Sequence, residues 1–235
     1  MTSGLPCDLI PALIDGWMES MAASCIVIGI AGASGSGKST LAAGLQTRLE
    51  EHLSAPVLLL GEDAYYRDQS ALSLAERATQ NYDDPAALDH DLLLQHLQQL
   101  RSGRSVQQPD YDYTRHTRSD ETVLLEPAPC LLVEGLFLLA RPALRHELTV
   151  SLFVDTAPDL CLLRRLRRDM ASRGRTAESV LQQYEQTVRP GYIRHVAPSR
   201  AQADTVVDGS RETTAMIDQG WRALCAALPR LRTGD

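Results

Sequence analysis

The segment 32–40 constrains this chain more than any other part of its sequence. It reads Gly-Ala-Ser-Gly-Ser-Gly-Lys-Ser-Thr and matches the pattern G-x-x-x-x-G-K-[ST]. An apolar run at 25–30 precedes it and predicts a buried strand, and leucines at every fourth position over 40–53 predict a helix with one apolar face. A strand, a glycine-rich loop and a helix in this order predict a loop whose backbone N–H groups bind phosphate.

Two side chains of this segment have specific expected roles. The Lys38 ammonium should reach the β- and γ-phosphates of a nucleotide, and the Ser39 hydroxyl should bind Mg²⁺. Lys38 is the only lysine among the 23 Lys and Arg residues, and a planar guanidinium would not fit a tight phosphate cradle as an ammonium does. The residues expected to bind the nucleotide are Gly32, Ala33, Ser34, Gly35, Ser36, Gly37, Lys38, Ser39 and Thr40.

Composition is that of an ordinary globular protein, with 44% hydrophobic and 23% charged residues in 235. Because this length suits one sizeable core, we expect a single domain over 25–235. The net charge of −7 argues against non-specific binding to nucleic acid or to anionic membranes. The longest apolar run is shorter than the ~20 residues of a membrane span. The five cysteines form no Cys-x-x-Cys pair, so we expect reduced thiols and a cytoplasmic location.

Residues 1–24 form an extension that precedes this domain. Their apolar positions over 5–24 recur at helical spacing and predict an amphipathic helix. A signal peptide would begin with basic residues and contain an unbroken apolar core, which this segment lacks. We favour packing on the domain over a subunit contact or a lipid surface, because the polar face of the helix is acidic.

Further apolar runs predict the other strands of a sheet. Helical spacing between them predicts crossover connections, so we expect an α/β fold with a doubly wound, mostly parallel sheet. Two extended runs around a polar middle, over 106–125, predict a β-hairpin insertion. The predicted strands lie at 56–60, 131–139, 150–155 and 205–208, and further helices at 71–79 and 86–100.

Two carboxylates follow or interrupt predicted strands. Asp63 lies just beyond the run 56–60, at the edge where open α/β sheets bind ligands, although a loop carboxylate is usually only solvated. Glu134 interrupts the buried run 131–139, where a charge is costly unless a cation meets it. That cation would be Mg²⁺ on bound phosphate, or an arginine.

Six arginines crowd into twelve residues of this acidic protein. A solvated helix face is the ordinary alternative for such a cluster. Phosphoryl transfer, however, spreads negative charge over oxygens that mobile cations must cover, and the break at 172–175 predicts an arginine-rich lid. The cluster lacks the aromatic partners that nucleic-acid binding would need. Its members are Arg164, Arg165, Arg167, Arg168, Arg173 and Arg175.

Seven further segments are informative through their order and spacing. They are GEDAYYRD (61–68), NYDDP (81–85), PDYDYTRHTR (109–118), LLVEGLFLL (131–139), LFVDT (152–156), RRLRRDMASRGR (164–175) and QQYEQTVRP (182–190). From Ile26 to Asp208 the chain thereby resembles the uridine kinases, also called uridine-cytidine kinases. The resemblance implies a P-loop NTPase fold with ATP as donor and Mg²⁺ as cofactor. It also implies pyrimidine salvage, in which the 5′-hydroxyl of uridine or cytidine is phosphorylated to UMP or CMP.

The same resemblance implies roles for individual residues. Asp63 would deprotonate the acceptor hydroxyl, and Lys38 and Arg168 would neutralise charge on the transferring group. Mg²⁺ would lie between Ser39 and Glu134. Similar enzymes form homotetramers, which implies a homo-oligomer. The ribose-binding residues would be Asp83, Arg165 and Gln183, the pyrimidine-reading residues Tyr111, His116 and Arg175, and the aromatic walls Tyr82 and Tyr113.

Two alternative functions remain open from the sequence. A related small-molecule kinase such as a phosphoribulokinase would need extra cations near Asp83, where Asp84 adds a second acid instead. A non-catalytic nucleotide-sensing regulator would keep Lys38 and would not need Asp63. Asp84 and Asp110 also differ from the residues usual in the resembling family, so either could change the charge of the substrate pocket.

Overall fold

The central sheet of the protein has five strands and is parallel throughout. In the computed structural model, which describes residues 25–228 and 231, the strand order is β2-β5-β1-β6-β7. This arrangement confirms the predicted α/β architecture, with β1 paired to β5 on one side and to β6 on the other. The predicted helix over 5–24 lies outside the described residues. The strands are β1 (Ile26–Gly32), β2 (Val57–Gly61), β5 (Cys130–Gly135), β6 (Val150–Asp155) and β7 (Thr205–Asp208).

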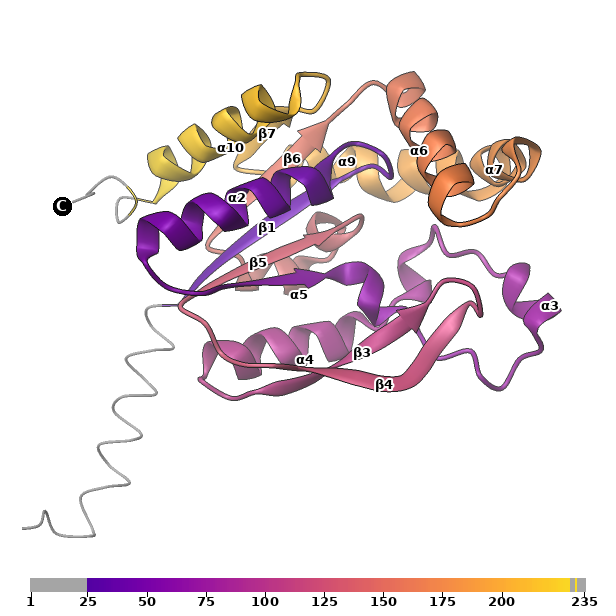
Figure 1. Cartoon of the computed structure of the whole chain (residues 1–235), viewed down its shortest axis with the longest axis horizontal. Coiled ribbons are helices and arrows are strands. Elements are labelled where there is room, and N and C mark those ends of the chain that lie inside the picture. The colour runs from indigo at the N-terminus through magenta and orange to yellow at the C-terminus, as the bar shows by residue number, and fades with distance from the viewer. Residues whose placement is uncertain (1–24, 229–230, 232–235) are drawn as a thin grey trace, which may run out of the picture.

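Helices cover both faces of this sheet (Figure 1). Successive side chains of a strand point to opposite faces. Ile28 therefore belongs to a core with α2 (Lys38–Leu53) and α10 (Thr213–Ala227). Its neighbour Val27 belongs to a second core with α4 (His90–Arg101) and the short α5 (Pro142–Glu147). Burial on both faces explains why the strands read as continuous apolar runs.

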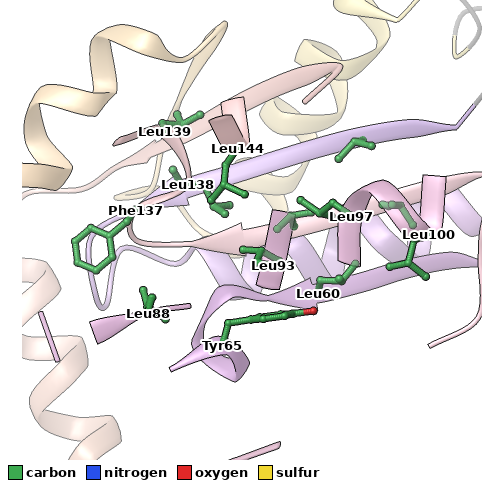
Figure 2. Packing of buried hydrophobic residues seen from close by; sticks show 14 of the residues in the cluster. Leu60, Tyr65, Leu88, Leu93, Leu97, Leu100, Phe137, Leu138, Leu139 and Leu144 are labelled. Atoms are coloured by element: carbon green, nitrogen blue, oxygen red, sulfur yellow. The ribbon is translucent and has the colours of Figure 1, made fainter. Parts of the chain in front are cut away.

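The second core contains the side chains drawn in Figure 2. Leu93 and Leu97 of α4 have no exposed surface and pack in one cluster with Leu60 of β2 (Figure 2). Phe137, which follows β5, belongs to the same cluster and is 1% exposed. This core fixes the ends of β2 and β5 relative to each other, and both ends carry candidate site residues.

The predicted strand at 131–139 is too long, because β5 ends at Gly135. The Phe137 N–H donates to the Glu62 carboxylate at 2.9 Å, and the 3₁₀-helix η4 (Leu138–Ala140) follows. Leu138 and Leu139 are nevertheless buried. The apolar letters beyond Gly135 therefore reflect packing into the core and not strand pairing.

The predicted hairpin is present as β3 (Val106–Asp112) and β4 (Thr117–Leu125), which pair in antiparallel. The pairing register shifts between Pro109 and Tyr111. The helix predicted at 71–79 is shorter, α3 (Leu74–Ala78), because a capping box formed by Ser73 and Glu76 fixes its start. Among helices of the described residues, none is long and apolar enough to cross a membrane.

The arginine cluster lies on α6 (Pro158–Ser172) and the turn that follows it. Gly174 has φ 61°, a conformation that favours glycine, and separates α6 from α7 (Ala177–Gln183). Helical turns of mixed type continue from α7 to residue 202 and return the chain to β7. These turns are η5 (Tyr184–Val188), α8 (Arg189–Gly191), η6 (Tyr192–Val196), α9 (Ala197–Ser199) and η7 (Arg200–Gln202).

Candidate active site

The loop between β1 and α2 has the geometry of an anion site. Gly37 precedes α2 with φ 102°, no side chain in the described part of the chain caps the first turn, and this turn contains no acidic residue. The first N–H groups of a 16-residue helix are therefore available to a phosphate. Gly35 has φ 82°, and a Cβ there would lie 2.4 Å from the Cys161 carbonyl oxygen. Both positions consequently require glycine.

Neighbouring segments hold this loop in shape. The Ser36 carbonyl accepts from the Thr156 hydroxyl at 2.8 Å and from Arg164 Nη1 at 3.2 Å. Arg164 also donates to the Gly209 carbonyl at 2.9 Å. Arg164 thus supports the backbone of the phosphate loop through the Ser36 carbonyl.

Lys38 and Ser39 both meet Glu134. The Ser39 hydroxyl donates to Glu134 Oε1 at 2.9 Å, and Lys38 Nζ lies 3.6 Å from Oε2. Glu134 pairs in register with Ile30 and is the penultimate residue of β5, so it lies at the strand end and not in mid-strand as its sequence suggested. Glu134 Oε2 is buried and accepts no hydrogen bond from any residue that the structure describes. A second cation beside this carboxylate would therefore be favourable.

The donor set around Glu134 suits Mg²⁺. Hydroxyl and carboxylate oxygens are the ligands that this cation prefers, and Mg²⁺ is usually held by one or two carboxylates together with substrate phosphates. Within the part of the chain that the structure describes, no group of three or more His, Cys, Asp or Glu residues could hold a metal alone. A Mg²⁺ shared between Ser39, Glu134 and bound phosphate fits these residues.

Asp63 lies at the same edge of the sheet. It is the second residue of the 3₁₀-helix η2 (Glu62–Tyr65), which follows β2, and Gly61 of β2 is paired with Glu134. Asp63 Oδ2 accepts from the Tyr113 hydroxyl at 3.2 Å. Asp63 Oδ1 is buried and has no hydrogen-bond partner among the described residues. This carboxylate therefore has hydrogen-bonding capacity that the described residues leave unused.

A cleft of about 1170 Å³ opens beside these groups. Its lining comes from the phosphate loop, the hairpin, the turn before α4 and the lid helices α6 and α7. Ser34 and Lys38 line it from the loop. The predicted residues that also line it are Asp63, Tyr82, Asp83, Tyr111, Tyr113, His116, Arg165, Arg168, Arg175 and Gln183. Residues more than a hundred positions apart in the sequence therefore line the same cleft.

Asp83 is a buried carboxylate in this cleft, with 8% of its surface exposed. Burial raises its pKa, which the hydrogen bond from Thr187 and the charge of Arg165 partly oppose. The Thr187 hydroxyl donates to Asp83 Oδ2 at 2.7 Å. A Cβ on Gly191 would lie 2.2 Å from the Asp83 carbonyl oxygen, so the helical turns after α7 pack directly on this loop.

Aromatic rings form the wall near the hairpin. The Tyr82 ring stacks on His116 with centroids 5.6 Å apart and planes 20° apart. His116 has φ 52°, and its carbonyl accepts from the Tyr82 hydroxyl at 3.3 Å. Tyr66 links this pair to the hairpin through ring contacts with Tyr82 and with Tyr111. Burial lowers the pKa of His116, so its imidazole is neutral at pH 7 and can donate or accept a hydrogen bond.

The lid side chains bond to one another. Gln183 Oε1 accepts from Arg165 Nη2 at 2.9 Å and also from Arg175. Arg165 Nη1 donates to the Ser34 hydroxyl at 2.9 Å, which joins the lid to the phosphate loop. Arg168 is held by Asp169, whose Oδ1 accepts from its Nε at 2.8 Å.

Comparison with known proteins decides the family. A sequence profile described as "Phosphoribulokinase / Uridine kinase family" matches residues 27–215. The chain belongs to this family. It is 46% identical over 202 residues to the uridine kinase of Yersinia enterocolitica, across 86% of this chain and 95% of that protein. It is 47% identical over 202 residues to that of Yersinia pestis, with the same coverage.

Solved structures agree on the fold of this family member. A putative fructose transport system kinase from a Silicibacter species superposes with a TM-score of 0.64 at 20% identity, covering 86% of this chain and 99% of that one. At that identity the likeness concerns the fold alone. Together with the parallel sheet and the phosphate loop, it confirms the predicted P-loop kinase architecture.

Asp169 is a residue of this kinase fold that the sequence did not single out. It has no exposed surface, and four arginines lie around its carboxylate. Its position four residues after Arg165 and four before Arg173 was visible as helical spacing, but its burial was not. The shortest distances are 3.5 Å to Arg165, 2.8 Å to Arg168, 3.6 Å to Arg173 and 3.9 Å to Arg175.

The two unusual acids, Asp84 and Asp110, do not line the cleft. Asp84 caps the turn η3 (Pro85–Ala87) by accepting from the Ala86 N–H at 2.9 Å, and it lies 3.7 Å from His195 Nε2. Asp110 is exposed at the register shift of β3 and accepts from the Ser119 hydroxyl at 3.1 Å. Each therefore has a local structural partner outside the pocket.

Proposed function

We propose that this family member is an ATP-dependent kinase that phosphorylates the 5′-hydroxyl of uridine and cytidine. Curated relatives at 46% and 47% identity, matched over 95% of their length, are uridine kinases. The observation that carries the proposal is the shared cleft. In it, Asp63 with one unpartnered oxygen and Lys38 of the phosphate loop face the eight residues expected to hold a nucleoside.

The donor side follows from the phosphate loop. Its backbone N–H groups and the Lys38 ammonium would bind the β- and γ-phosphates of ATP. Ser39 and Glu134 would hold Mg²⁺, which supplies charge neutralisation to the phosphates when bound. Arg168 lines the cleft from the lid and would face the charge that develops on the transferring group.

The acceptor side begins with Asp63. Its carboxylate would accept the proton of the 5′-hydroxyl as the oxygen forms a bond to the γ-phosphorus and the bond to the ADP oxygen breaks. The lid arginines would exclude water, which would otherwise take the place of the nucleoside hydroxyl. Asp63 therefore acts as the base, and the arginines select the nucleophile.

The nucleoside would lie between the lid and the hairpin. Asp83, Arg165 and Gln183 would bind the ribose hydroxyls, and Tyr82 and Tyr113 would flank the base as aromatic walls. Tyr111, His116 and Arg175 would read the pyrimidine. A neutral His116 can donate to the O4 of uridine or accept from the N4 amine of cytidine, so both nucleosides should be substrates.

A nucleoside panel tests the proposal. With ATP and Mg²⁺, uridine and cytidine should release ADP, whereas 2′-deoxyuridine should react far less well, because sites built to bind a hydroxyl reject analogues that lack it. Adenosine should be excluded by the aromatic walls. Activity on ribulose 5-phosphate alone would indicate a phosphoribulokinase-like enzyme, and ATP binding without turnover on any acceptor would indicate a regulator.

Two further properties belong to this proposal. A cytoplasmic location is expected, because the reaction consumes ATP. A homo-oligomer, a tetramer by resemblance, would cover the apolar side chains that β4 exposes, with Val123 at 49% and Leu124 at 54% exposure. Light scattering on the full chain would measure the assembly.

A further inference from the structure

Tyr113 joins three elements of the cleft that are distant in sequence. It follows β3 at the tip of the hairpin, and its hydroxyl donates to Asp63 Oδ2 at 3.2 Å. The guanidinium carbon of Arg173, on the lid, lies 4.4 Å from the centroid of the Tyr113 ring. One side chain therefore touches the proposed base with its hydroxyl and the lid with its ring.

The two oxygens of Asp63 differ because of this contact. Oδ2 has the Tyr113 hydroxyl as its donor, whereas Oδ1 is buried and has no partner among the described residues. A carboxylate held through one oxygen cannot rotate freely, so the Tyr113 hydroxyl fixes the orientation of the Asp63 carboxylate at the edge of the cleft. An aromatic wall alone would need the ring of Tyr113 and not its hydroxyl.

Arg173 connects this arrangement to the lid. A cation over the face of a tyrosine ring is attracted by the ring, and Arg173 is itself 3.6 Å from the buried Asp169. Arg173 belongs to the lid and directly precedes the turn at Gly174. When the lid changes position, this cation therefore moves with it. The ring of Tyr113 is thus ordered when the lid lies over it.

We propose that the Tyr113 hydroxyl positions the catalytic base Asp63, and that Arg173 orders Tyr113 when the lid closes. The inference rests on the proposed function, since it takes Asp63 as the base. It assigns to Tyr113 a role beyond that of an aromatic wall. Closure of the lid over the nucleotide would in this way align the carboxylate with the acceptor hydroxyl.

Tyr113→Phe removes one oxygen atom and keeps the ring. We expect kcat for uridine to fall about tenfold, the effect of losing one hydrogen bond to a charged acceptor, with the KM for ATP unchanged. Ser119→Ala removes one hydroxyl oxygen from the same hairpin, where it donates to the exposed Asp110 outside the cleft, and should match the wild type. An unchanged kcat in Tyr113→Phe would overturn the proposal. So would a rise in kcat/KM, which would mean that the hydroxyl only blocks the acceptor's place.

The pH profile separates positioning from a general structural effect. A carboxylate that loses a donor is protonated more easily, so the acidic limb of kcat/KM should move to higher pH in Tyr113→Phe. An unmoved limb would show that the hydroxyl does not act through Asp63. All charged and titratable neighbours are retained in this variant, so a shifted limb reports the lost donor. These neighbours are Lys38, Glu62, Tyr66, Asp83, Tyr111, Glu134 and Arg173.

A double-mutant cycle tests the part played by Arg173. In an Arg173→Met background, Tyr113→Phe should lower kcat only about threefold, because the hydroxyl is already poorly ordered. Independent effects of the two substitutions would remove Arg173 from the proposal. Asp63→Asn distinguishes the two levels of inference. If it retains turnover, the base assignment fails, whereas an inactive Asp63→Asn beside a normal Tyr113→Phe contradicts only the positioning role.

Discussion

The buried pair Glu62–His90 gives a sharp stability prediction. Glu62 has no exposed surface and His90 is 4% exposed, and His90 Nε2 lies 2.9 Å from Glu62 Oε1. The other oxygen, Oε2, accepts from the Phe137 N–H at 2.9 Å. The pair therefore joins the start of α4 to the turns that follow β2 and β5. The Glu62 carboxyl group depends on both partners, because water does not reach it.

His90→Ala removes one partner and leaves the carboxylate in place. For an ionised pair, removing one partner costs about 3–5 kcal/mol, because an uncompensated charge stays in the interior. For a chain of this size, 1 kcal/mol corresponds to roughly 2–4 °C, so the melting temperature should fall by about 6–20 °C. His146→Ala is the matched control, since His146 is exposed on α5, and it should change stability by less than about 0.5 kcal/mol.

Glu62→Gln isolates the contribution of the charge. In this background the amide can still bond to Phe137, and His90→Ala leaves only a neutral group unpaired, at a cost of about 1–3 kcal/mol. Urea unfolding of the four proteins of this cycle measures the difference directly. Equal costs of His90→Ala in both backgrounds would refute the argument from buried charge, and a shift under about 2 °C would refute the contact itself.

Three further predictions concern catalysis. Asp63→Asn keeps the shape of the side chain but removes the proposed base, so kcat should fall by about 10² or more while ATP affinity, measured by calorimetry, stays near normal. Lys38→Arg should lose most activity although its charge is kept, and near-normal turnover would contradict the fit argument. Because burial raises the pKa of Asp83, the KM for uridine should increase on acidification at a pH above the ordinary aspartate range, whereas a pH-independent KM would exclude Asp83 as a charged acceptor.

Much of the fold was predictable because its elements have clear patterns in the local sequence. The phosphate loop has a strand before it and a helix after it, and fully buried parallel strands necessarily read as apolar runs. The overlong strand at 131–139 shows the limit of this signal. Phe137, Leu138 and Leu139 are as buried as strand residues, but they pack from a turn and a 3₁₀-helix. A run of apolar residues shows that a segment is buried. It does not show where the strand ends, because that depends on where pairing with the neighbouring strand stops.

The candidate site was predictable only in part, for a related reason. Each residue of a recognisable motif could be named, but partners across the fold could not. Thr187 bonds to Asp83 across 104 positions, and the Tyr113 hydroxyl reaches Asp63 across 50. Neither threonine nor tyrosine carries a local signal for such contacts. Only the tertiary arrangement of hairpin, lid and loop brings these groups together.

Asp169 holds the arginines of the lid in place without balancing their total positive charge. Four guanidinium groups lie within 4 Å of its one carboxylate, so the group has an excess of three positive charges. A single buried acid keeps the arginines on one side of the cleft, and Arg168 remains 40% exposed there. Repulsion among the uncompensated cations opposes a closed lid, and an anion between them relieves that repulsion. The surplus of positive charge therefore favours an anionic ligand on this side of the cleft.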